Sequence, residues 1–107
     1  MTTIEFSNQD GRITGFCCHG HSGYAEAGAD IVCAAVTSAI RLTDCILSDV
    51  LGENIRTTVE EEDARITLTL PASCEEEDTA QSVLTGLMLL LSDLRDEYPA
   101  YVEVLEV

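Results

Sequence analysis

The sequence contains no tryptophan, and aromatic residues make up only 5% of its 107 residues. An aromatic-rich core is therefore excluded, and we expect a core of aliphatic side chains. Hydrophobic residues reach 46%, which is too many for a chain that stays disordered. At this length we expect one domain, spanning residues 1–107, with room for a single core.

Basic residues are scarce as well. Five Lys and Arg stand against twenty Asp and Glu, which gives a formal net charge of −15. Such a charge repels the phosphates of nucleic acids and attracts basic polypeptides. The composition therefore argues against direct nucleic-acid binding and favours a basic protein as a partner.

Segments that would direct the chain into or across a membrane are also missing. The first residues, MTTIEFSNQDG, lack the basic stretch and apolar run of a signal peptide. The longest apolar stretch, Leu87–Leu91, is far too short to cross a bilayer. We therefore expect a cytoplasmic protein without membrane contact, whose five cysteines are reduced thiols.

The hydrophobic pattern predicts seven elements in the order β-β-α-β-β-α-β. Alternation predicts two hairpins and a last strand, at residues 2–7 with 12–18, 55–59 with 66–70, and 101–107. Helical spacing predicts one helix from Asp30 to Gly52 and a second that opens with a capping box of Asp78 and Gln81. The order indicates an α+β fold, in which an antiparallel or mixed sheet packs with two helices.

The stretch GHSGYAEAGADIVCAAVTS, residues 20–38, holds the candidate functional residues. Its glycines Gly20, Gly23 and Gly28 predict a flexible loop, which in an enzyme would bind or cover substrate. Asp30 is suited to be the N-cap of the helix that follows. Cys33 would then lie in the first helical turn, where unpaired N–H groups and the helix dipole favour a thiolate.

A thiolate at Cys33 and a nearby base would suffice for nucleophilic catalysis. His21 is the candidate base if the loop folds back onto the start of the helix. The free backbone N–H groups of Cys33 and Ala34 are then candidates to stabilise an oxyanion.

Spacing alone leaves other interpretations open. A histidine and a cysteine at this separation occur by chance in many proteins, and a free cysteine is commonly a buried apolar residue. The segment CCHGH, residues 17–21, could supply zinc ligands together with Cys33. However, adjacent Cys17 and Cys18 would point to opposite faces of a strand and could not easily share one ion. We therefore expect no metal and no cofactor.

The stretch resembles the signature of the bacterial ribosomal-processing cysteine protease Prp family. That signature is Gly-His-small-x-aromatic-Ala, followed by Gly-x-Asp-Ile-Val-Cys-Ala-Ala. The matching positions are Gly20, His21, Gly23, Tyr24, Ala25, Gly28, Asp30, Ile31, Val32, Cys33, Ala34 and Ala35. One departure follows: family members often carry Ser four residues after the cysteine, where this chain has Thr37 and then Ser38.

The resemblance implies a cysteine endopeptidase with a dyad of His21 and Cys33. Its substrate would be a large-subunit ribosomal protein, the L-twenty-seven protein, whose N-terminal extension is removed during ribosome maturation by cleavage after an aromatic residue. The family also implies a homodimer and a mobile glycine-rich loop over the site. Asp30 would either orient His21 or cap the helix. A different class of function stays open, in which an acidic module without catalysis binds a basic ribosomal partner.

Overall fold

A computed structural model of the chain describes residues 1–20 and 27–107, and the side chains of all of these except residues 27–30. The predicted order of elements is confirmed. The elements are β1 (Thr2–Gln9), β2 (Arg12–His19), α1 (Ala27–Cys45) with the π-helical turn η1 (Ile46–Val50), β3 (Arg56–Glu60), β4 (Arg65–Thr69), α2 (Glu77–Glu97) and β5 (Val102–Glu106).

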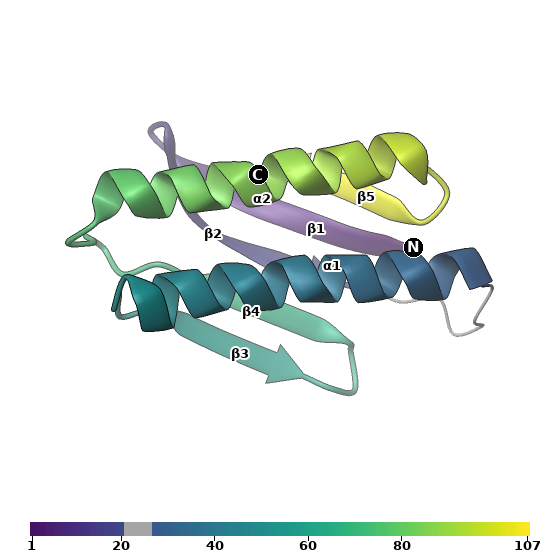
Figure 1. Cartoon of the computed structure of the whole chain (residues 1–107), viewed down its shortest axis with the longest axis horizontal. Coiled ribbons are helices and arrows are strands. Elements are labelled where there is room, and N and C mark those ends of the chain that lie inside the picture. Colours follow the sequence, from purple (N-terminus) through teal and green to yellow (C-terminus); the bar gives the residue numbers. More distant parts are fainter. Residues whose placement is uncertain (21–26) are drawn as a thin grey trace.

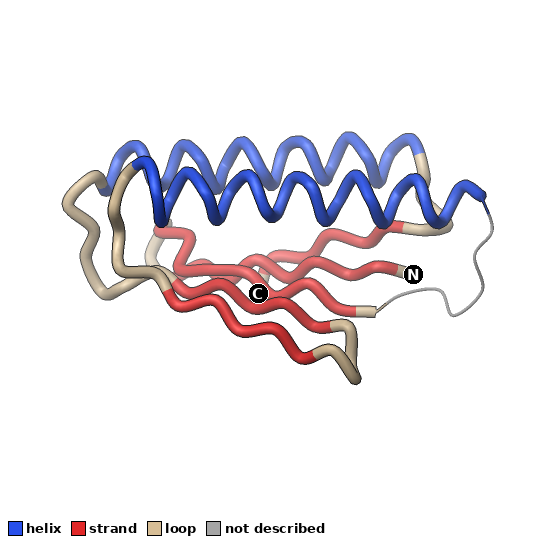
Figure 2. The backbone as a smooth tube through the Cα atoms, turned by 60° about the horizontal axis from the view of Figure 1, so that its bottom comes forward, coloured by secondary structure: helices blue, strands red, loops and turns tan. Residues whose placement is uncertain are grey.

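The strands form one mixed sheet in the order β3-β4-β2-β1-β5. Neighbouring strands are antiparallel except for β1 and β5, which are parallel. Both helices pack against the same face of this sheet (Figures 1 and 2). The α+β prediction is therefore confirmed, with the helices forming one layer and the sheet the other.

The first hairpin turns where the sequence predicts. Asp10 and Gly11 both have positive φ angles, 53° and 83°, between the paired residues Gln9 and Arg12. Two positive φ angles define the type I′ turn that Asp-Gly favours, because its twist matches that of the flanking strands.

The core lies between the sheet and the two helices. Alternation along the strands turns one set of apolar side chains toward the helices, and the rings of Phe6 and Phe16 meet there at 5.8 Å between centroids. Leu68, Val36 and Leu84 add aliphatic contacts from β4, α1 and α2. Burying each such side chain contributes roughly 1.5–3 kcal/mol to folding.

Helix α1 begins at Ala27, so the prediction that Asp30 is its N-cap is wrong. Its other end agrees with the sequence, because Gly52 takes the left-handed conformation, φ 68°, just after η1. The segment Ile31–Val50 is long and apolar enough to cross a membrane by length and composition. However, its residues Val32 and Leu47 are buried in the core, as expected for the core helix of a globular domain.

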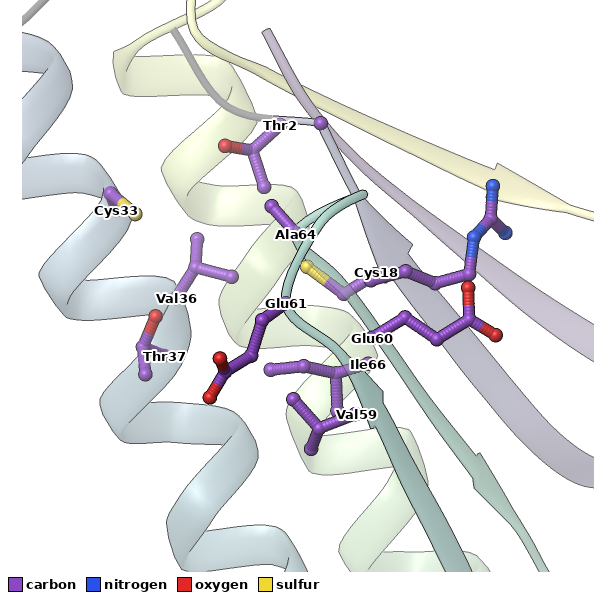
Figure 3. Close-up of a pocket in the computed structure, with 12 residues that line it drawn as sticks. Thr2, Cys18, Cys33, Val36, Thr37, Val59, Glu60, Glu61, Ala64 and Ile66 are labelled. Atoms are coloured by element: carbon purple, nitrogen blue, oxygen red, sulfur yellow. The ribbon is translucent and has the colours of Figure 1, made fainter. Parts of the chain in front are cut away.

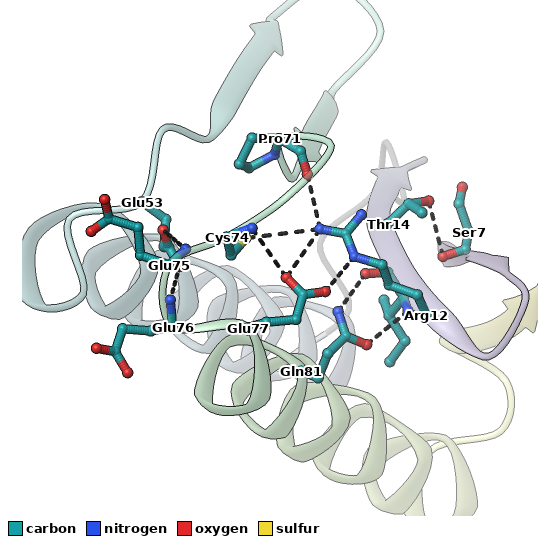
Figure 4. A network of polar contacts seen from close by, with 11 residues as sticks. Ser7, Arg12, Thr14, Glu53, Pro71, Cys74, Glu75, Glu76, Glu77 and Gln81 are labelled. Atoms are coloured by element: carbon teal, nitrogen blue, oxygen red, sulfur yellow. Dashed lines mark hydrogen bonds and ion pairs between the residues drawn. The ribbon is translucent and has the colours of Figure 1, made fainter.

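The start of α2 also differs from the prediction. Gln81 does not close a capping box with Asp78; its amide instead bonds both the N–H and the C=O of Ile13 in β2, at 2.8 Å each. The N–H groups of Glu75 and Glu76 donate to the buried carboxylate of Glu53 at 3.1 and 2.9 Å (Figure 4). A carboxylate distant in the sequence therefore holds the turn that leads into α2.

A second polar contact joins the same region to β2. The Arg12 guanidinium donates to the Glu77 carboxylate and to the Pro71 carbonyl (Figure 4). The hydrogen bond from Arg12 is the main reason that the pKa of Glu77 lies below its usual value. Burial raises the pKa of the neighbouring Cys74 thiol to about 11, and the Glu53 charge adds to the effect. This contact fixes the start of α2 on the sheet.

Candidate active site

A pocket of about 210 Å³ lies between α1, the end of β2 and the β3–β4 hairpin (Figure 3). It is bordered by residues of β1, β2, α1, β3 and β4 and of the segments that follow β2 and β3. They are Thr2, Cys18, Gly20, Cys33, Val36, Thr37, Val59, Glu60, Glu61, Ala64, Arg65 and Ile66. The wall therefore combines one exposed thiol with several aliphatic side chains.

Cys33 is exposed and borders this pocket from α1. Because α1 begins at Ala27, Cys33 is the seventh residue of the helix rather than the third. The backbone N–H groups without a partner in a helix are those of its first four residues. The prediction that the N–H groups of Cys33 and Ala34 form an oxyanion hole is therefore wrong. The same start places Asp30 and Gly28 within the first turn of α1.

Gly20 borders the pocket at the point where β2 has ended. Its φ angle is +85°, and a β-carbon on it would lie 2.5 Å from the carbonyl oxygen of Met1. Both the conformation and the close approach therefore require glycine. His21 and Gly23, the next predicted site residues, lie outside the described residues, so their predicted roles stay predictions.

Cys18 borders the same pocket from β2, a position that the sequence reasoning missed. Its side chain is buried, and burial raises the pKa of its thiol to about 11, with smaller contributions from the thiols of Cys17 and Cys33. A thiol with this pKa stays protonated at neutral pH and is a poor nucleophile. Of the two thiols at this pocket, that of Cys33 is exposed and that of Cys18 is buried. The sequence does contain a signal for this position. Cys18 is two residues after the core residue Phe16 in the same strand, so both side chains point to the same face of the sheet.

The apolar wall of the pocket comes from parts of the chain that the sequence analysis assigned only to structure. Val59 and Ile66 are paired across β3 and β4 and lie on the α1 side of the hairpin (Figure 3). Thr37 stands one helical turn after Cys33, on the same face of α1. The pocket is therefore able to receive an apolar side chain next to the Cys33 thiol.

The other residues considered as site candidates lie on the far side of the sheet. His19 contacts Glu5, with 3.6 Å between Nε2 and a carboxylate oxygen, and alternation places it on the face opposite to Cys18. Cys17 faces the same way and accepts a hydrogen bond from Arg65 at 3.0 Å. Within residues 1–20 and 31–107, whose side chains the structure describes, no group of three or more His, Cys, Asp or Glu side chains is arranged to hold a metal ion.

Comparison with known proteins points to one family. The family model described as Cysteine protease Prp matches residues 1–103. Among curated proteins, no sequence matches the chain significantly.

Solved structures share the fold. The chain is similar to an essential ribosomal processing protease Prp from S. aureus in complex with a substrate peptide, with a TM-score of 0.89, 19% identity and 100% of both chains covered. For the same protease with a covalently linked product peptide, the TM-score is 0.86, the sequence identity is 20%, and 100% of both chains is covered. For a protein from Streptococcus mutans, the TM-score is 0.85 and the sequence identity is 21%, with 100% of this chain and 96% of that chain covered.

Proposed function

The chain belongs to the Prp family of cysteine proteases, and we propose that Cys33 and His21 form its catalytic dyad. One observation carries the proposal: Gly20, which immediately precedes His21 in the sequence, borders the same pocket as the exposed thiol of Cys33. Adjacent Cα atoms are about 3.8 Å apart across a trans peptide, and we assign His21, one residue after Gly20, to this pocket.

The reaction is acyl transfer to the thiol, followed by hydrolysis. The Cys33 thiolate attacks the scissile carbonyl, and the C–N bond breaks as protonated His21 gives its proton to the departing amine. His21 then takes a proton from water, whose oxygen attacks the thioester and releases the acid and the free thiolate. Asp30 in the first turn of α1 is the candidate to orient His21, now that its role as a cap has been excluded.

The pocket matches cleavage after an aromatic residue. A dry cavity of about 150 Å³ with aliphatic and aromatic walls is large enough to bind benzene. The present pocket, at about 210 Å³ with Val36, Val59 and Ile66 in its wall, has room for a phenyl ring beside Cys33. The aromatic side chain that precedes the scissile bond would occupy it.

The proposed substrate is the ribosomal L-twenty-seven protein with its N-terminal extension, cleaved in the cytoplasm during ribosome maturation. Two solved structures of the S. aureus relative describe it as a ribosomal processing protease, one of them in complex with a substrate peptide, which supports this substrate class. The net charge of −15 favours encounter with a basic ribosomal protein.

The family resemblance also suggests a homodimer, and α1 offers apolar surface for one. Ile31 and Leu42 on α1 and Val50 at the end of η1 are 63%, 61% and 71% exposed. Sedimentation equilibrium of the purified protein measures the mass directly, and a monomer at micromolar concentration would contradict this part of the proposal.

The decisive experiment is to incubate the protein with the unprocessed ribosomal protein and to identify the cut by mass spectrometry. Cys33→Ala and His21→Ala should each abolish cleavage, and Asp30→Asn should slow it. His19→Ala and Cys45→Ala are the matched controls, because His19 lies on the opposite face of the sheet and Cys45 is exposed but outside the pocket. Cleavage by His21→Ala at the unchanged rate would remove His21 from the mechanism, and binding without any cut would favour a non-catalytic module.

A further inference from the structure

The rim of the pocket carries a carboxylate, that of Glu61, with no hydrogen bond or ion pair to any side chain that the structure describes. Glu61 follows β3 at the start of the hairpin turn and borders the pocket. Its side chain points across the pocket mouth toward Thr37 of α1, whereas Glu60 points away from α1 (Figure 3). The Glu61 carboxylate therefore lies on the same side of the hairpin as the Cys33 helix.

Nothing in the described part of the chain neutralises this carboxylate. Among residues 1–20 and 31–107, whose side chains are described, no hydrogen-bond donor or cation pairs with the Glu61 side chain. The backbone carbonyl of Glu61 accepts a hydrogen bond from the N–H of Ala64 at 3.2 Å. The structural role of Glu61 is thus carried by its backbone, and its charge is free for a ligand in the pocket.

We propose that Glu61 is a specificity-determining residue that pairs with a cationic side chain of the substrate near the scissile bond. The inference rests on the proposed protease function and adds a requirement to it. Glu61 borders the same pocket as Val36, Val59 and Ile66, so a peptide that places an aromatic side chain there would lie close to the Glu61 carboxylate. A Lys or Arg within a few residues of the scissile bond would meet that charge, while an acidic residue there would be repelled.

The hairpin supplies its own control. Glu62 and Asp63 follow Glu61 in the same turn and are exposed like it, but neither borders the pocket. A general effect of negative charge would change equally when any of these three residues is neutralised. A specific contact would change only with Glu61.

The test compares peptides that carry one aromatic residue before the scissile bond and a single Lys, Gln or Glu at each flanking position in turn. With the wild-type protein, Lys should raise kcat/KM over Gln about tenfold at one position, and added salt should reduce this preference. Glu61→Gln should bring the ratio close to one, and Glu61→Lys should favour Glu over Lys at that same position. Glu62→Gln should keep the wild-type ratio.

The outcomes separate the two proposals. Cleavage with no Lys preference at any position, or a preference that persists in Glu61→Gln, would overturn the role of Glu61 and leave the protease function standing. Loss of the Lys preference in Glu62→Gln to the same extent would also overturn the role of Glu61, because the preference would then come from the general negative charge of the hairpin turn. Failure of the wild-type protein to cut any peptide or the ribosomal protein would overturn both.

Discussion

Gly20 lies against Met1 so closely that a β-carbon on Gly20 would be 2.5 Å from the Met1 carbonyl oxygen. This approach brings the first residues of the chain to the pocket that also holds Cys33, since Thr2 forms part of its wall. The contact joins the start of β1 to the end of β2, directly before His21.

Gly20→Ala should therefore damage the site by two effects at once. The left-handed φ angle costs a non-glycine residue about 1 kcal/mol, and the added methyl group displaces either Met1 or the end of β2. We expect cleavage to fall at least about tenfold, with the midpoint of urea denaturation lowered only modestly. Gly52→Ala is the matched control, because Gly52 also has a positive φ but open space around it. Equal effects of the two substitutions on cleavage would contradict this interpretation.

The five cysteines should differ sharply in reactivity. Cys33 and Cys45 are both exposed on α1, so accessibility alone predicts equal alkylation rates. If a base activates Cys33, iodoacetamide near neutral pH should modify it at least about tenfold faster than Cys45. His21→Ala should bring the two rates together, and mass spectrometry of the peptides measures both.

Cys18 and Cys74 should react slowest in the same experiment. Burial raises the pKa of each thiol to about 11, so about one molecule in a thousand carries the thiolate at pH 8. Rapid modification of Cys18 in the folded protein would show that the floor of the pocket opens to solvent.

Removal of the Glu53 carboxylate should destabilise α2. Glu53→Ala leaves the N–H groups of Glu75 and Glu76 without their acceptor, which should lower the free energy of unfolding by about 1–2 kcal/mol in urea denaturation. Asp78→Ala is the control, because the sequence pattern assigned the capping role to Asp78. It should cost about 0.5 kcal/mol, the value of one charge near the helix dipole. A larger loss in the free energy of unfolding with Asp78→Ala than with Glu53→Ala would instead support the capping box that the sequence predicts.

The pair of Arg12 and Glu77 should stabilise the fold only where Glu77 is ionised. The pKa of Glu77 is lower in the folded protein than in the unfolded chain, chiefly because Arg12 donates a hydrogen bond to it. The contribution is therefore complete above the unfolded value of about 4.3 and is lost as the pH falls through the folded value.

Urea denaturation at several pH values tests this dependence. Glu77→Gln should be less stable than the wild type at neutral pH, and the difference should shrink as the solution is acidified. Glu76→Gln should show little difference at any pH, since its carboxylate has no partner among the described residues. A difference for Glu77→Gln that stays constant down to pH 3 would exclude the ion pair as its cause.

The sequence predicts those features that depend on neighbouring residues. Alternation and helical spacing give the order of elements, and Asp10-Gly11 gives the first turn, because each pattern reflects local geometry. The start of α1 is mispredicted because Gly28 indicates a loop and Asp30 indicates a cap, yet the helix already includes both residues.

Features built from distant residues could not be predicted in this way. The Glu53 carboxylate accepts from the N–H of Glu76, 23 positions later in the sequence, and no pattern in the residues around either partner predicts this contact. The apolar wall of the pocket depends on the register that sets Val59 opposite Ile66 and on the packing of their hairpin beside α1. Only the fold brings these side chains to Cys33, whose candidacy as the nucleophile came from the sequence alone.

The parallel pairing of β1 with β5 has a consequence for synthesis of the protein. The N–H of Thr2 donates to the carbonyl of Tyr101, and Thr2 is part of the pocket wall. A nascent chain still lacking residues 101–106 has no partner for that side of β1, so translation must pass this point before the wall can assemble. A chain that ends before residue 101 would therefore contain Cys33 but would lack the strand that holds Thr2 in the pocket wall.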